Sequence, residues 1–248
     1  MLLVLPPSET KRDGGPEGSA LELGTLSFSA LTPERRAAIA ALRSLSRNLG
    51  LATEALGLGP TQRFELTRNR ELLASPVLPA IERYTGVLYD GLDVVTLSPD
   101  QRAFAAQHLA IGSALFGLLR ADDPIPAYRL SHDSRLPGLS LGRHWRGAVS
   151  AVLEEEPGLV LDLRSEAYAS LGRAPLRKES FYIRVLSEAP DGRRNALSHF
   201  NKKAKGELTR AVLASRVDHG SLRSLLDWAA SVGIRLEPGA EGELDLVV

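Results

Sequence analysis

Short apolar runs alternate with longer amphipathic segments along the chain. Four of these runs are typical of buried strands, because each is apolar for several residues and is bounded by polar or turn-forming residues. The first and the last run stand at opposite ends of the sequence, so we expect the sheet to draw on both ends of the chain. The predicted strands are residues 2–5, 159–163, 181–186 and 244–248.

Two predicted helices carry clear N-terminal signals. A capping hydroxyl residue precedes a proline at Thr32-Pro33 and again at Ser98-Pro99, and Gln101 completes a capping box with Ser98. Helical periodicity continues after Pro99, so we predict that this helix extends to about residue 120. The residues predicted to face inward from it are Phe104, Ile111, Leu115 and Leu118.

Strands separated by several helices predict a mixed α/β (α+β) fold. We expect residues 1–248 to form a single compact domain with a central mixed sheet and flanking helices. Residues 122–142 are rich in proline, glycine and arginine, which predicts an ordered loop over the surface.

One inserted element has a pattern of its own, at residues 51–73. A short helical stretch leads into a Leu-Gly-Leu-Gly turn at residues 56–59, and a second helix starts around Pro60. This is the pattern of a helix-hairpin-helix, in which Gly57 and Gly59 allow backbone amides to face a phosphate near a helix N-terminus. A plain helix C-cap at either glycine explains the same residues.

Composition limits the classes of function. The 248 residues carry no formal net charge and include no cysteine, which excludes disulfides, thiolate metal sites and a cysteine nucleophile. The five histidines are scattered without metal-ligand spacing, so we expect no metal and no other cofactor. No run approaches the length of a membrane span, and the apolar start is too short for a signal peptide. We therefore expect a soluble, cytoplasmic protein.

Positive charge is concentrated near the C-terminal third. Three of the five lysines are Lys202, Lys203 and Lys205, and residues 193–216 hold seven basic residues against one acid. On a helix, Ala204, Leu208 and Val212 would form an apolar stripe, while Lys203, Gly206 and Arg210 would form an open cationic face. Gly206 costs a helix about 1 kcal/mol relative to alanine, which suggests that a phosphate approaches the backbone there. A solvated helix face is the simpler alternative.

A DNA-binding interpretation gives each cation a role. Lys202, Lys203, Lys205 and Arg210 would neutralise phosphates, while Arg129 and Arg135 would grip a phosphate or stack on an unpaired base. Because no base-reading helix of the usual type occurs, we expect recognition of DNA structure and not of sequence. A basic cleft that meets an acidic protein surface is an alternative. Tyr84, Tyr89 and Tyr128 would offer stacking faces, although packing in the core explains aromatic residues equally well.

An enzymatic interpretation begins with Ser8 and Lys11. A Ser-x-x-Lys pair on a helix places a hydroxyl and an amine one turn apart, and a desolvated Lys11 could act as a base or nucleophile, as in lyase chemistry on damaged DNA. A nucleotide or a flipped base would suit a polar cleft. The residues that could converge on such a cleft are Ser8, Lys11, Tyr84, Tyr89, Arg129, Ser165, Tyr168, Lys202 and Lys203.

Several blocks stand out in sequence order, among them Pro7-Ser8-Glu9-Thr10-Lys11, residues 83–92, residues 112–120, residues 163–168 and the block from Phe200 to Gly206. Together these blocks resemble the YaaA family of peroxide stress proteins. The resemblance implies a YaaA-like fold and a protein that protects DNA during hydrogen peroxide stress and limits damage from intracellular iron. It also implies DNA binding through a basic cleft and a helix-hairpin-helix. The alternative from the residues themselves is an enzyme that processes nucleotides or damaged bases.

Overall fold

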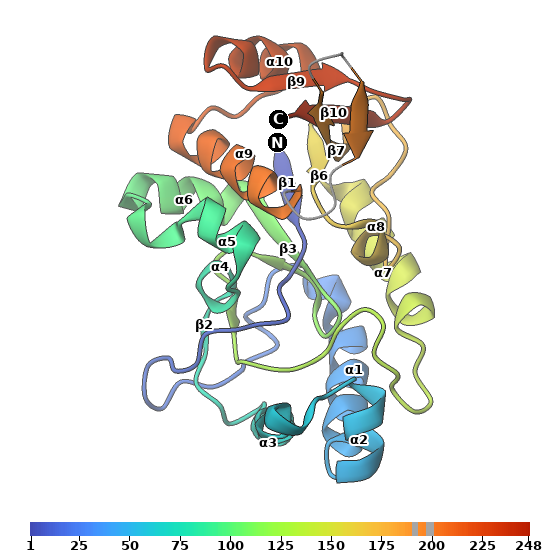
Figure 1. The fold of residues 1–248 in the computed structure, drawn as a ribbon. Helices are drawn as coiled ribbons and strands as arrows, with labels where there is room; N and C mark the ends of the chain where they lie inside the picture. Colours follow the sequence, from blue (N-terminus) through green and yellow to red (C-terminus); the bar gives the residue numbers. More distant parts are fainter. Residues whose placement is uncertain (190–192, 197–200) are drawn as a thin grey trace.

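In the computed structural model, which describes residues 1–189, 193–196 and 201–248, a central sheet of eight strands runs through the molecule (Figure 1). Phe200 of the predicted lysine block and His199 lie outside the described residues. The strand order is β4-β3-β1-β6-β7-β10-β9, and β8 pairs with β7. The strands are β1 (Leu2–Leu5), β3 (Leu109–Ser113), β4 (Gly117–Arg120), β6 (Val160–Asp162), β7 (Ser180–Glu188), β8 (Arg194–Ala196), β9 (Arg235–Pro238) and β10 (Glu243–Val247).

The order of the strands reverses between β1 and β6. From β1 the chain proceeds to β3 and β4 on one side, and it then crosses to β6, β7 and β10 on the other. β1, β3, β6, β7 and β10 are parallel, whereas β4, β8 and β9 pair antiparallel to their neighbours. Ligands of open α/β sheets bind beyond the carboxyl ends of the strands at such a reversal. We therefore expect a ligand site among the residues that follow β1 and β6.

Helices cover both faces of the sheet, with α5, α6 and α9 on one side and α7 on the other (Figure 1). A second, two-stranded sheet joins β2 (Leu78–Pro79) to β5 (Pro124–Ile125). The α-helices are α1 (Thr32–Leu45), α2 (Leu49–Ala55), α3 (Phe64–Glu71), α4 (Ala80–Arg83), α5 (Val87–Leu92), α6 (Pro99–His108), α7 (Leu141–Glu155), α8 (Glu166–Ala169), α9 (Asn201–Ser215) and α10 (Leu222–Ser231), with 3-10 turns at Ser29–Leu31, Pro60–Gln62 and Val94–Thr96.

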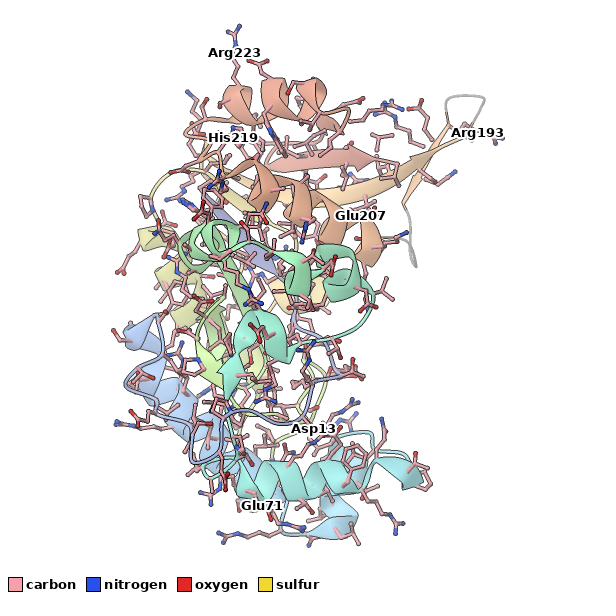
Figure 2. The ribbon with its side chains drawn as sticks, turned by 90° about the vertical axis from the view of Figure 1, so that its left-hand side faces the viewer. Asp13, Glu71, Arg193, Glu207, His219 and Arg223 are labelled. Atoms are coloured by element: carbon pink, nitrogen blue, oxygen red, sulfur yellow. The ribbon has the colours of Figure 1, made fainter. Side chains whose placement is uncertain are left out.

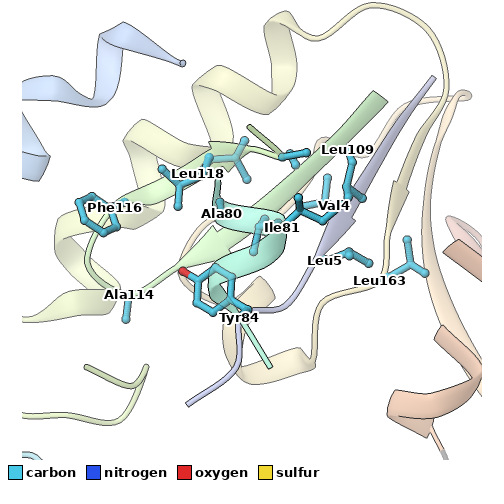
Figure 3. Packing of buried hydrophobic residues seen from close by; sticks show 14 of the residues in the cluster. Val4, Leu5, Ala80, Ile81, Tyr84, Leu109, Ala114, Phe116, Leu118 and Leu163 are labelled. Atoms are coloured by element: carbon cyan, nitrogen blue, oxygen red, sulfur yellow. The ribbon is translucent and has the colours of Figure 1, made fainter. Parts of the chain in front are cut away.

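The core is built around β1. Val4 and Leu5 lie between Leu109 of β3 and Leu163, the residue after β6 (Figure 3). All four side chains are fully buried. Because β1 has neighbours on both edges and helices on both faces, its position is fixed on every side. The segment that leaves β1 therefore starts from a rigid point.

The mixed α/β fold is confirmed, and all four predicted strands are present. The capping box is confirmed as well: the Gln101 amide N–H donates to Ser98 Oγ (3.3 Å) and the Ser98 amide N–H donates to Gln101 Oε1 (2.9 Å). α1 is present but begins at Thr32, one residue before the predicted Pro33, and the Thr32 hydroxyl makes no cap, since Leu31 is the N-cap residue.

The long helix predicted to reach residue 120 is wrong. α6 ends at His108, and the chain continues directly into β3 and then β4. Every residue of β3 is buried, and a strand that is apolar on both faces has no alternation to distinguish it from a helix. Within the described part of the chain, no helix is both long enough and apolar enough to span a bilayer.

Candidate functional site

A cavity of about 490 Å³ lies at the carboxyl ends of β1 and β6. Its size is in the range of small-molecule and nucleotide sites. Five separate stretches of the chain form it: the segment after β1, α5 through Leu88, the loop around residue 131, the segment after β6 and the first turns of α9. The lining residues are Pro6, Pro7, Ser8, Glu9, Thr10, Leu88, Ser131, His132, Leu163, Ser165, Tyr168, Asn201, Lys202 and Lys205.

The segment after β1 is held in place by Lys11. Its buried ammonium donates hydrogen bonds to the carbonyl oxygens of Ser8 (3.0 Å) and Glu9 (3.2 Å), and it lies 4.2 Å from the centroid of the Tyr128 ring. Burial lowers the pKa of Lys11 to about 7. The amine lies behind the segment that lines the cavity, because Ser8, Glu9 and Thr10 line it and Lys11 does not.

Ser8 and Lys11 do not lie one turn apart on a helix, so the structure offers no serine-hydrolase pair of this kind. Residues 8–11 form no helix, and Lys11 instead makes an isolated bridge with Tyr84. The Ser8 hydroxyl lies 3.2 Å from the Thr10 hydroxyl, while the Lys11 amine bonds to the carbonyl of Ser8.

Three of the four predicted cleft tyrosines belong to the core. Tyr84, Tyr89 and Tyr128 are each at most 5% exposed, so they offer no stacking face. The Tyr128 hydroxyl lies 2.8 Å from that of Tyr84 and 2.7 Å from the hydroxyl of Ser113, and the Tyr89 hydroxyl donates to the carbonyl of Pro6 (2.9 Å). These hydrogen bonds lie beneath the segment after β1, and the bond to Pro6 holds its first residue in place. Burial raises the pKa of all three tyrosines above the usual range, so they stay neutral.

Tyr168 is the fourth, and it lines the cavity. It is half-buried, and its ring meets the ring of His132 edge to face with centroids 5.1 Å apart. Its position is set by Ser165, whose hydroxyl accepts from the Tyr168 amide at the start of α8 (3.4 Å). Burial raises the pKa of Tyr168 to about 12. A neutral aromatic ring therefore faces the cavity from the β6 side.

A buried ion pair fixes the segment after β6. The guanidinium of Arg164 contacts the carboxylate of Asp162 at 2.6 Å and also donates to the carbonyl of Gly172 at 2.8 Å. Both side chains of the pair are buried. The backbone carbonyl of Arg164 is thereby held facing α9, where it accepts a hydrogen bond from Lys205 Nζ (3.3 Å).

Lys205 is buried, although the sequence placed it with the phosphate-binding cations. Its side chain is 3% exposed and its Nζ lies 5.3 Å from the centroid of the Tyr182 ring. Burial lowers the pKa of Lys205 to about 8, an effect that the nearby Asp162 and Glu166 oppose. The described residues place no carboxylate within 4.0 Å of Nζ. Lys205 is therefore a desolvated amine on the wall of the cavity and not a surface cation.

The other basic residues of α9 differ from one another. Lys202 is exposed and lines the cavity, with no ion-pair partner among the described residues. Lys203 is exposed and lies 3.5 Å from Glu207, and a guanidinium N–H of Arg210 donates to the carbonyl of Asp93 (2.8 Å). The exposed face of α9 thus carries two lysines that a ligand could reach.

The interpretation of Gly206 as a point of phosphate approach is wrong. A Cβ atom at this position would lie 2.1 Å from the carbonyl oxygen of Leu88 in α5. The glycine is buried because α5 and α9 pack closely there. It therefore serves the contact between two helices, and both the apolar stripe and the glycine are buried.

The two arginines of the proline-rich loop are also separated by the fold. Arg129 is 9% exposed and forms an ion pair with Glu9, at 2.8 Å between guanidinium and carboxylate. Arg135 is exposed, but it lines a different cavity of about 550 Å³ between α2 and residues 133–137. The charged residues around that second cavity are Glu54, Asp133 and Arg135, which gives it no cationic excess.

The inserted element at residues 51–73 contains two helices and a glycine turn, as expected, but the amides of its turn already have acceptors. The Gly57 amide donates to Glu54 O (3.1 Å), the Leu58 amide to Thr53 O (2.9 Å), and the Gly59 amide to the side chain of Gln62 (3.0 Å). Gly57 has φ 60°, as a helix-terminating glycine does. The geometry agrees with the simpler C-cap interpretation.

Sequence reasoning missed several residues of the site. Glu9, Thr10, Asn201 and His132 all line the cavity. Glu9 and Asn201 stand inside blocks that the sequence had singled out, so their place in those blocks was the available signal. In the described residues, no three histidine, aspartate or glutamate side chains gather as metal ligands.

Comparisons with known proteins extend over the whole chain. A family model described as peroxide stress protein YaaA matches residues 1–232. A UPF0246 protein of Corynebacterium glutamicum is 43% identical over the full length of both chains. A UPF0246 protein of Streptomyces coelicolor is 41% identical over 97% of this chain and 93% of its own length. A third, from Caulobacter vibrioides, is 28% identical over 100% of this chain and 98% of its own length.

Proposed function

Because this chain belongs to the peroxide stress protein YaaA family, we propose that it acts in the response to hydrogen peroxide by binding DNA. It would protect DNA and limit the damage that intracellular iron causes. The bound feature would be an unpaired or distorted nucleotide, which enters the cavity at the ends of β1 and β6. The neighbouring phosphates would meet the first turn of α9.

The observation that carries this proposal is the convergence of remote stretches on one cavity. The wall of this cavity combines residues 6–10, 131–132, 163–168 and 201–205. The protein as a whole has no net charge that would attract a polyanion, so the attraction would have to come from such a local grouping. Lys202 stands on that wall, and Lys203 lies on the exposed face of the same helix turn. Two cations at the beginning of a helix add to the positive end of its dipole, which favours phosphate.

The size and lining of the cavity favour one nucleotide over a duplex. A volume of about 490 Å³ accepts a base and its sugar, whereas a double helix would have to remain outside. Tyr168 presents an aromatic ring, and Ser8, Thr10 and Asn201 supply hydroxyl and amide groups. Such groups hold an unstacked base by stacking and by hydrogen bonds to its edge.

The test measures DNA affinity as a function of salt. We compare an intact duplex and a duplex with one unpaired nucleotide, using the native protein and the Lys202→Met/Lys203→Met double variant. We expect the double variant to bind about tenfold more weakly and to reduce the slope of log K against log salt by one to two. Lys178→Met is the matched control, because Lys178 is exposed and lies outside the cavity.

The outcomes separate the candidate functions. Equal affinity and equal salt slope in the double variant and the control would remove α9 from the interface. Failure of the native protein to bind any DNA would reject the proposal. Binding of an acidic protein in place of DNA would then favour a role as a partner-binding protein.

A further inference from the structure

We propose that Lys205 is a nucleophilic amine that forms an imine with the aldehyde of a damaged nucleotide, namely the ring-opened sugar of an abasic site. The inference rests on the proposed function, since the nucleotide must first enter the cavity. It adds a substrate class and a covalent step to a site that would otherwise only bind DNA.

The first argument is the unusual environment of Lys205. Buried lysines are ordinarily paired with a carboxylate, because burying an unpaired ammonium is costly. Among the residues that the structure describes, Lys205 has instead one carbonyl acceptor, Arg164 O at 3.3 Å, and the carboxylate of Asp162 is already engaged by the Arg164 guanidinium. This arrangement gives the amine a fixed direction and little stabilisation of its charge. Burial accordingly lowers the pKa of Lys205 to about 8, which leaves a useful fraction of neutral amine near neutral pH.

The second argument comes from the other lysines of the chain. Lys178, Lys202 and Lys203 are exposed to solvent. Lys11 is buried and has a lowered pKa, but two carbonyl acceptors and the Tyr128 ring surround its amine behind the cavity wall. Lys205 alone among the five lysines both lines the cavity and is buried. The reactive amine that the sequence suggested at Lys11 is therefore assigned to Lys205.

The covalent step is balanced without a further reactant. The neutral amine of Lys205 attacks the aldehyde carbon, so that a carbon–nitrogen bond forms and the carbonyl oxygen becomes a hydroxyl. That oxygen then leaves as water with the two amine hydrogens, and a carbon–nitrogen double bond remains. Hydrolysis reverses the step, and a hydride donor such as cyanoborohydride converts the imine into a stable secondary amine.

The experiment incubates the full chain with a duplex that contains one abasic site and with cyanoborohydride, then maps the adduct by mass spectrometry. We expect an adduct on Lys205 in the native protein, and at least a tenfold lower yield for both Lys205→Met and Lys205→Arg. Lys205→Arg preserves the cation and so tests for loss of the amine without loss of charge. Lys178→Met should match the native yield. The affinity of each variant for the same duplex without the reductant is measured alongside.

Three results would overturn the inference. They are binding of the abasic duplex without any adduct, an adduct spread over the exposed lysines or the N-terminal amine, and an unchanged yield in Lys205→Arg. The first of these leaves DNA binding intact, so failure of the imine and failure of the proposed function are distinguishable.

A second probe keeps the inference testable if no DNA binds. Limiting pyridoxal 5′-phosphate at pH 8, reduced in place, should label Lys205 ahead of Lys178, Lys202 and Lys203. Labelling that follows exposure alone would contradict the proposal.

Discussion

The beginning of α9 and the hairpin between α2 and α3 have similar sequence signals, but they differ in whether their hydrogen-bond donors are available to a ligand. Both regions combine glycine with a helix start and were predicted to meet phosphate. In the hairpin, the amides of residues 57–59 already have acceptors within the chain. At α9, Lys202 lines a cavity with no ion-pair partner in the described residues. Figures 1 and 2 place α3, with Glu71, at one end of the molecule, well away from α9, with Glu207.

The difference shows that backbone amides and lysine ammonium groups can bind a ligand only when the fold leaves them without a hydrogen-bond acceptor or ion-pair partner inside the protein. A glycine turn can satisfy its own amides locally, because the acceptors are only three to five residues away. Exposed lysines at a helix start have no such local acceptor unless an acid stands one turn later, as Glu207 does for Lys203.

Gly206→Ala should have the largest effect. The new methyl group would collide with the carbonyl of Leu88, so we expect the free energy of unfolding to fall by about 3 kcal/mol, as for an overpacked core. Urea unfolding measures this free energy. Gly147→Ala is the matched control: this exposed helical glycine in α7 has no atom near its Cβ position, so alanine there should stabilise by about 0.5 to 1 kcal/mol. A harmless Gly206→Ala with weakened DNA binding would restore the phosphate interpretation.

Gly57→Ala in the hairpin should have a smaller effect. Its φ of 60° strains an alanine by about 1 kcal/mol, while the site has room for the methyl group. Gly158→Ala, at φ 71° and equally uncrowded, should cost about the same. We expect both variants to bind DNA within about twofold of the native protein. A tenfold loss of DNA affinity in a folded Gly57→Ala protein, with Gly158→Ala unaffected, would place the hairpin in the interface.

The pH dependence of stability should show the smallest effect. Because the folded pKa of Lys205 is lowered from 10.5 to about 8, the unfolded state binds more protons above pH 7, and stability rises with pH. Replacement by methionine removes this contribution, so the rise in unfolding free energy from pH 7.5 to 8.5 should decrease by about 0.7 kcal/mol. Gly57→Ala should leave the rise unchanged. An equal rise in Lys205→Met and native protein would show that Lys205 is not desolvated.

Sequence patterns predicted the parts of the fold that depend on local physics. The capping box at Ser98 and the run Leu2–Leu5 before two prolines each specify their own conformation. β3 was missed because a strand buried on both faces shows no alternation. The burial of Lys205 and Gly206 was missed for another reason. It depends on where β6, β7 and α5 pack against α9, and these elements are distant in sequence.

The same distinction between local and long-range determinants applies to the residues predicted for the candidate site. Ser8, Ser165, Tyr168 and Lys202 were predicted and do line the cavity. Arg129 and Arg135 were predicted with them, but one is paired with Glu9 and the other lies at a different cavity. Ion pairing across the fold has no local signature, so charge alone could not tell an available arginine from an engaged one.

The most direct test of a nucleotide-accepting cavity is the ratio of two dissociation constants, for an intact duplex and for a duplex with one unpaired nucleotide. Extrusion of a paired base costs a few kcal/mol, so the native protein should prefer the unpaired nucleotide by at least about tenfold. Thr10→Trp, which fills the cavity from an exposed lining position, should bring the ratio close to one while duplex affinity stays within about threefold. An equal ratio in native protein and Thr10→Trp would contradict the account.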